Sequence, residues 1–92
     1  MHPTEITQLL SRLIAFDTTS RNSNLELIAF VETFLSERGV TSKRIPSPDA
    51  TKANLIATIG PQDVPGYVLS AHTDVVPVDD QAWSSDPFQA VI

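Results

Sequence analysis

The most informative part of this chain is Tyr67-Val68-Leu69-Ser70-Ala71-His72-Thr73-Asp74-Val75-Val76-Pro77. The run from Tyr67 to Ala71 is short and mostly apolar, which predicts a buried β-strand over residues 67–71. A histidine follows this run directly, and an aspartate comes two residues later. Because alternate residues of an extended chain project to the same face, we expect the side chains of His72 and Asp74 to point the same way.

The His72 and Asp74 pair has a direct chemical interpretation. Neutral imidazole is a common ligand of zinc, and a carboxylate that accepts the other ring N–H fixes the tautomer. At the carboxyl end of a strand, where open α/β sheets carry their sites, His72 would bind a metal ion and Asp74 would orient its ring. Alternatively, Asp74 caps a turn and His72 bonds a carbonyl oxygen, since one histidine is never a complete metal site. The spacing alone leaves both interpretations open.

Two amphipathic helices are predicted before this segment. Apolar residues recur at helical spacing over residues 3–16, and the polar run 17–23 ends that helix. A second helix is predicted from Ser23 or Asn24 to Arg38, with Gly39 in the left-handed conformation just past its end. The stripes predicted to be buried are Ile6, Leu9, Leu10, Leu13 and Ile14 in the first helix, and Leu27, Ile28, Val31, Phe34 and Leu35 in the second.

Strand patterns follow the second helix. Residues 40–45 predict an edge strand that the prolines at 46 and 48 end, and residues 53–59 predict a second strand that closes at Gly60. After the predicted strand 67–71 the chain is loop-like until Phe88, where residues 88–92 predict the beginning of another strand. This order predicts the α/β class, as a partial layered domain with two N-terminal helices followed by strands of a mixed sheet. We expect residues 1–92 to be one incomplete domain.

Composition narrows the choice of partners. The formal net charge is -5, and the six Lys and Arg residues are scattered along 92 residues, which predicts no nucleic-acid partner. Apolar runs are far shorter than the ~20 residues of a membrane span, and the first residues lack the pattern of a secretory signal. The chain has no cysteine, which excludes disulfides and thiolate metal ligands from it. We therefore expect a cytoplasmic protein with no membrane partner.

Residues 69–77, followed by Asp79-Asp80, Trp83 and Asp86-Pro87-Phe88, resemble the first signature of the M20 metallopeptidase family. That family includes acetylornithine deacetylases, succinyl-diaminopimelate desuccinylases, aminoacylases and peptidases. The predicted helices and hairpin also fit, so the resemblance covers essentially the whole chain. It implies the N-terminal part of a zinc-peptidase-like catalytic domain, with no counterpart here of the family's lid and dimerisation domain.

The resemblance implies roles for two residues. His72 would be a ligand of one of two metal ions, zinc or cobalt, and Asp74 would be the catalytic-site carboxylate that clamps the His72 ring. The family's bridging carboxylate, its glutamate pair with the general base, its remaining acidic ligand and its closing histidine have no counterpart in this chain. The resemblance further implies a small N-acyl amino acid as substrate and a homodimer for the full-length protein, with the isolated chain inactive.

Within the family, the segment 83–88 and the compact N-terminus are most similar to the acetylornithine deacetylases. This implies a metal-dependent amide hydrolase that removes the acetyl group from N-acetylornithine in arginine biosynthesis. Two alternatives remain open. One is another M20 hydrolase, acting on a different acyl group or on a dipeptide, and the other is a non-catalytic binding module derived from the same scaffold.

The remaining polar and aromatic residues are expected to have structural roles. Trp83 and Phe88 are expected to be packing anchors of the loop after the motif, and Asp86, which precedes a proline, to make a local turn bond. The adjacent acidic pair at 79 and 80 is expected to be solvated, and His2 to be inert at a frayed terminus.

Overall fold

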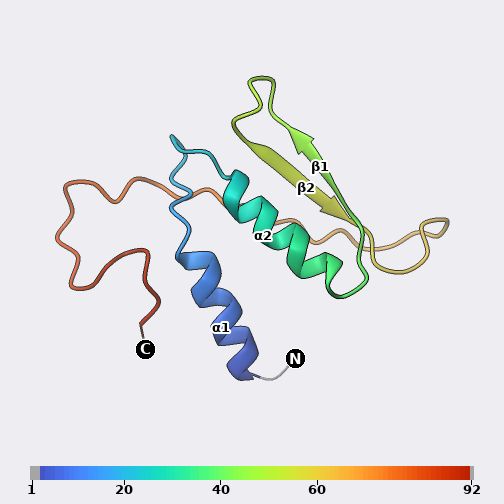
Figure 1. The fold of residues 1–92 in the computed structure, drawn as a ribbon, viewed down its shortest axis with the longest axis horizontal. Coiled ribbons are helices and arrows are strands. Elements are labelled where there is room, and N and C mark those ends of the chain that lie inside the picture. The colour runs from blue at the N-terminus through green and yellow to red at the C-terminus, as the bar shows by residue number, and fades with distance from the viewer. Residues whose placement is uncertain (1–2, 92) are drawn as a thin grey trace. The chain divides into compact units, whose positions relative to one another are not determined.

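The computed structural model describes residues 3–91. Its elements are, in order, α1 (Pro3–Ile14), α2 (Leu25–Ser36), β1 (Ser42–Pro46) and β2 (Ala53–Ala57) (Figure 1). The chain divides into two compact units: Ser23–Thr73, which holds α2, β1 and β2, and a second unit made of Met1–Asn22 together with Asp74–Ile92. The predicted α/β class and the order helix, helix, strand, strand are confirmed.

Helix α2 ends where the sequence predicts a glycine stop. Gly39 has a φ of 74°, which a residue without a Cβ adopts at little cost. Its N–H donates to the Ser36 carbonyl at 3.0 Å, and the Val40 N–H donates to the Leu35 carbonyl at 2.9 Å. These two bonds form a Schellman motif and satisfy carbonyl groups that the helix end leaves unpaired. The helix ends two residues earlier than predicted, at Ser36, because Glu37 and Arg38 belong to this turn.

Strands β1 and β2 form a two-stranded antiparallel hairpin whose register runs from Ser42 opposite Ala57 to Pro46 opposite Ala53. The connecting turn is closed by its own polar groups: the Ser47 N–H donates to the Lys52 carbonyl at 2.9 Å. The strands begin and end within two residues of the predicted bounds. Pro46 is the last residue of β1 rather than the residue that follows it, and a proline is tolerated on such an edge.

The small core of this unit lies where α2 packs on the hairpin (Figure 1). Leu27, Ile28 and Ala53 are each only 4% exposed. Asn24, just before α2, ties the helix to β2: its Nδ2 donates to the Ala53 carbonyl at 2.9 Å, and its Oδ1 accepts the Ala53 N–H at 3.0 Å. One amide side chain thereby satisfies both backbone groups of a buried strand residue.

The two predicted apolar stripes are buried to different extents. In α2 the predicted positions at Leu27 and Ile28 are buried, whereas the rest of that stripe is half-buried. In α1, Ile6 is 52% and Leu10 is 54% exposed, so the prediction of a buried stripe is wrong at these positions. An amphipathic pattern gives a helix its apolar face, but burial of that face needs a second surface to pack against. Neither helix in the described part of the chain has the length and apolarity that crossing a membrane requires.

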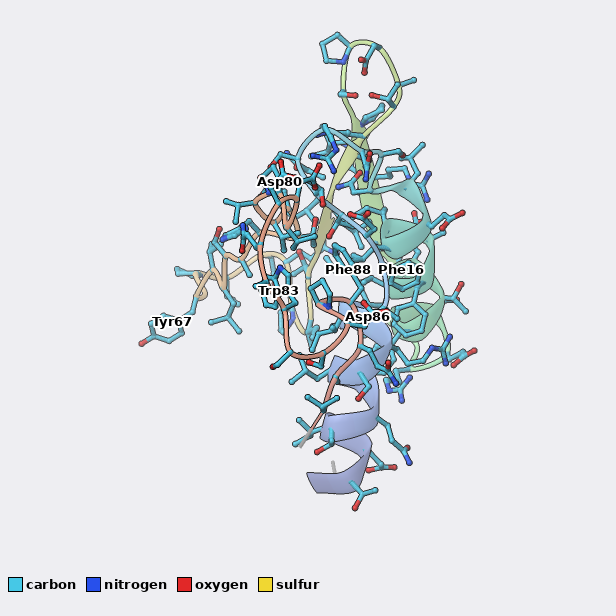
Figure 2. All side chains as sticks on the ribbon, turned by 90° about the vertical axis from the view of Figure 1, so that its left-hand side faces the viewer. Phe16, Tyr67, Asp80, Trp83, Asp86 and Phe88 are labelled. Carbon is cyan, nitrogen blue, oxygen red and sulfur yellow. The ribbon has the colours of Figure 1, made fainter. Side chains whose placement is uncertain are left out.

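Two predicted strands are absent from residues 3–91. Residues 67–71 form no strand, and Val68 and Leu69 are 89% and 97% exposed. Figure 2 shows the Tyr67 side chain projecting away from the ribbon. Phe88 lies in a turn and residues 89–91 form no strand, while Ile92 lies outside the described residues. Both predictions are wrong for the same reason. A strand is defined by its hydrogen-bonded neighbour, and none of the described strands pairs with either stretch.

Candidate functional site

The two residues predicted to carry the chemistry, His72 and Asp74, are both exposed and lie on irregular chain. His72 is near the end of the unit that contains the hairpin, and Asp74 is the first residue of the segment that returns to the unit containing α1. The buried strand from which we derived their common direction is missing. Their assignment as metal ligand and orienting carboxylate therefore stays a prediction that rests on the resemblance.

Asp74 begins a stretch that is bound by the loop after α1. We call residues 17–21 the 17–21 loop and residues 74–79 the 74–79 segment. Thr19 and Val75 form an isolated parallel β-bridge, in which the Val75 N–H donates to the Thr18 carbonyl at 3.1 Å and the Ser20 N–H donates to the Val75 carbonyl at 3.0 Å. The loop and the segment lie side by side in the ribbon (Figure 1), so the backbone next to Asp74 is held on one side.

Side chains of the 17–21 loop extend this contact. The Ser20 hydroxyl oxygen lies 2.9 Å from Asp74 Oδ2 and 3.3 Å from the Val75 carbonyl oxygen. A hydroxyl has a single hydrogen to donate, so the shorter contact to the carboxylate is the stronger hydrogen bond. Next in sequence, Arg21 Nη2 lies 2.8 Å from Asp79 Oδ1. This hydrogen bond raises the pKa of Arg21, and it gives the half-exposed Asp79 an ion-pair partner in addition to the solvent we expected.

The 17–21 loop is itself fixed by a buried threonine. Thr19 is only 1% exposed. Its hydroxyl and its N–H both donate to Asp17 Oδ1, at 2.6 and 3.1 Å, which is an Asx-turn. The hydrogen bond from the Thr19 hydroxyl, followed by that from the Thr19 N–H, lowers the pKa of Asp17. The sequence predicts a polar turn here, but not that this turn delivers a hydroxyl to Asp74.

A metal ion needs more donors than these residues supply. Within residues 3–91 there is no group of three or more His, Cys, Asp or Glu side chains that could hold one. Imidazole is a suitable donor for zinc or cobalt, but a single imidazole is too few for a site. The other histidine, His2, lies outside the described residues. The donor type therefore fits a divalent ion, whereas the donor number within the described chain does not.

The loop after the motif is held by local bonds. Asp86 Oδ1 accepts the Phe88 N–H at 2.9 Å, so the local turn bond predicted for Asp86 is confirmed. Trp83 is 52% exposed, and its indole N–H donates to the Val78 carbonyl at 3.2 Å. Phe88 is half-buried. Figure 2 labels these side chains along the irregular C-terminal segment. Trp83 is thus held by the hydrogen bond of its ring nitrogen, and its side chain is only partly buried.

The chain is similar in sequence to deacetylases. It is 38% identical over 89 residues to the acetylornithine deacetylase of Pasteurella multocida (strain Pm70), which covers 89% of this chain and 23% of that protein. It is 39% identical over 67 residues to the acetylornithine deacetylase of Shigella sonnei (strain Ss046), covering 72% of this chain and 17% of that protein. A third relative, the acetylornithine deacetylase of Photorhabdus laumondii, is 39% identical over 75 residues, covering 80% of this chain and 19% of the relative.

The particular resemblance predicted from the sequence, to acetylornithine deacetylases, is thereby confirmed. The chain spans about a fifth of the length of the curated relatives that it matches. No family model matches the chain, and no solved structure matches it.

Proposed function

We propose that this chain is part of a hydrolase that removes the acetyl group from N-acetylornithine. The observation that carries the proposal is the identity of 37–39% to several acetylornithine deacetylases over 72–89% of the chain. Acetate and ornithine would be the products, which makes the reaction a step of arginine biosynthesis. The substrate would be a small N-acyl amino acid, and the full-length protein would be a cytoplasmic homodimer.

In this proposal His72 is one ligand of a zinc or cobalt ion, and Asp74 accepts a ring N–H of His72 and so fixes its tautomer. A divalent ion held there would supply Lewis-acid chemistry, polarising the amide carbonyl and lowering the pKa of a bound water. The other ligands, a second metal ion and the general base would come from parts of a longer polypeptide, because residues 3–91 gather no set of ligands. We expect the 92-residue chain by itself to be inactive.

The test is turnover by the complete polypeptide that contains this chain. We expect hydrolysis of N-acetylornithine that a chelator abolishes and that added zinc or cobalt restores. N-succinyl-diaminopimelate and a set of dipeptides serve as competing substrates in the same assay. A preference for one of these would reassign the chain to another hydrolase of the same kind, and no turnover of any of them would favour a binding module.

A pair of histidine variants tests the role of His72. In the complete polypeptide, His72→Ala should lower kcat/KM for N-acetylornithine by at least about a hundredfold, because losing a metal ligand costs more than the 10- to 100-fold typical of its supporting residues. The matched control is His2→Ala, which removes the other histidine of the chain and should leave kcat/KM unchanged. Equal activity of the two variants would reject His72 as a ligand.

A further inference from the structure

The side chain of Asp74 contacts a residue far away in sequence. Asp74 is exposed and lies on a segment without helix or strand, so no regular element fixes its side chain. The hydroxyl of Ser20, 54 residues earlier, donates to its Oδ2 at 2.9 Å. A carboxylate that must keep one orientation needs such support, because a functional side chain is held only as well as its neighbours hold it.

The 17–21 loop is suited to give that support. Thr19, the neighbour of Ser20, is buried and makes two hydrogen bonds to Asp17. The Asn22 N–H also donates to the Thr19 carbonyl, at 2.7 Å. On the other side, the Ser20 N–H donates to the Val75 carbonyl at 3.0 Å. The backbone of Ser20 is therefore held by its own N–H and by the bonds of its neighbour Thr19, and it lies opposite Val75, the residue that follows Asp74.

The bond also leaves the carboxylate able to act. A carboxylate accepts up to about four hydrogen bonds on its two oxygens, and Ser20 engages Oδ2 alone. Hydrogen bonds to an ionised acceptor are about twice as strong as neutral ones. The bond from the Ser20 hydroxyl can thus restrict rotation of the Asp74 side chain while it engages one of the two carboxylate oxygens.

We propose that Ser20 is a positioning residue for Asp74, and through it for the His-x-Asp motif. The proposal rests on the proposed hydrolase function, in which Asp74 orients the ring of His72. Ser20 touches neither substrate nor metal in this role. It holds a carboxylate on irregular chain, where the strand that the sequence predicts for residues 67–71 is missing.

The kinetic test uses the complete polypeptide with three variants. Ser20→Ala should lower kcat about tenfold and leave KM within about twofold, since misplaced supporting groups cost about 10- to 100-fold. Ser20→Thr keeps the hydroxyl and should restore most of kcat. Arg21→Gln is the matched control, because it removes another side-chain contact between the same loop and the same segment, at Asp79, without touching Asp74. Equal loss in Ser20→Ala and Arg21→Gln, or no loss in Ser20→Ala, would overturn the proposal.

A second readout does not depend on activity. The side-chain carboxyl ¹³C resonance of Asp74, assigned with Asp74→Asn, should move in Ser20→Ala and stay in place in Ser20→Thr and Arg21→Gln. An unmoved resonance in Ser20→Ala overturns the role of Ser20 even if the enzyme is active. A moved resonance in a polypeptide without turnover rejects the proposed deacetylase and leaves the Ser20–Asp74 bond established, so the two proposals fail separately.

Discussion

Residues 53–57 and residues 67–71 are similar in sequence and different in structure. Both are five-residue, mostly apolar stretches from which the sequence predicts a strand. The first forms β2, paired in register with β1, whereas the second is irregular, exposed chain that pairs with no described strand. The difference is the presence of a hydrogen-bonded neighbour. A turn of six residues, 47–52, joins β1 to β2 and lets the two strands pair, whereas no described strand pairs with residues 67–71.

An apolar, β-prone sequence is thus compatible with a strand, but the strand forms only where a hydrogen-bonded neighbour is present. Burial follows the same rule. Ala53 in β2 has α2 over it and Asn24 bonded to its backbone, and it is 4% exposed. Leu69 has a larger apolar side chain and is 97% exposed, because no element covers it among the described residues.

The largest expected effect comes from making the same Leu→Ala substitution in α2, which covers β2, and in the uncovered stretch 67–71. Leu27→Ala, in the core of α2 on the hairpin, should lower the free energy of unfolding of the 92-residue chain by about 2 kcal/mol, since it removes buried methyl groups and leaves a cavity. Leu69→Ala should change it by less than about 0.5 kcal/mol, because its side chain is already in solvent. Denaturant unfolding followed by circular dichroism measures both. A comparable loss at the two positions would mean that residues 67–71 are packed in solution.

A smaller effect tests how β2 is anchored. Asn24→Ala should cost about 1–2 kcal/mol, because it leaves the N–H and carbonyl of buried Ala53 without their partner. Asn54→Ala is the control: Asn54 is the next residue of β2 and is exposed, so its loss should cost a few tenths of a kcal/mol. The same denaturation curves give both values. If Asn24→Ala were as mild as Asn54→Ala, the strand would be held by the hairpin alone.

The smallest expected effect is on the pH dependence of the contact between the 17–21 loop and the 74–79 segment, which is formed by the Thr19–Val75 bridge. Hydrogen bonds from Thr19 hold the pKa of Asp17 below its ordinary value of 3.8. The unfolded chain therefore binds this proton at higher pH than the folded chain does. The stability contributed by Asp17 is fully present above pH about 4 and is lost as the pH falls through its lowered folded value.

Amide NMR between pH 5 and pH 2 should show this loss. The Val75 amide, bonded to the Thr18 carbonyl, should report it in the wild-type chain and not in Asp17→Asn. The control is Asp49→Asn in the hairpin turn, where the hydrogen bond from Ser47 likewise lowers the pKa of Asp49. That variant should alter the titration of residues around the hairpin turn and leave Val75 unchanged. If the Val75 amide titrated identically in the wild-type chain and in Asp17→Asn, the Asx-turn of Asp17 would not support the β-bridge.

The predictions that were confirmed all concern interactions between residues close together in sequence. Helix α2 and the left-handed Gly39 after its end follow from apolar spacing and a nearby glycine, and the hairpin follows from two strand patterns around a proline-containing turn. The turn bond of Asp86 reaches two residues. The failures and the omissions are all of longer range. No sequence pattern could show that residues 67–71 pair with none of the described strands. Nor could one show that Ser20 bonds to Asp74, 54 positions later.

The sequence by itself determined where helices and hairpin form, which two residues carry the motif, and to which enzymes the chain is similar. Each of these depends on local backbone preference or on the identity of residues at fixed spacing. Only the tertiary structure decided which apolar faces are buried, which extended stretch becomes a strand, and which hydroxyl binds Asp74. These depend on a second surface or a second partner, and the energy of burial and of hydrogen bonding exists only once both members of the pair are in place.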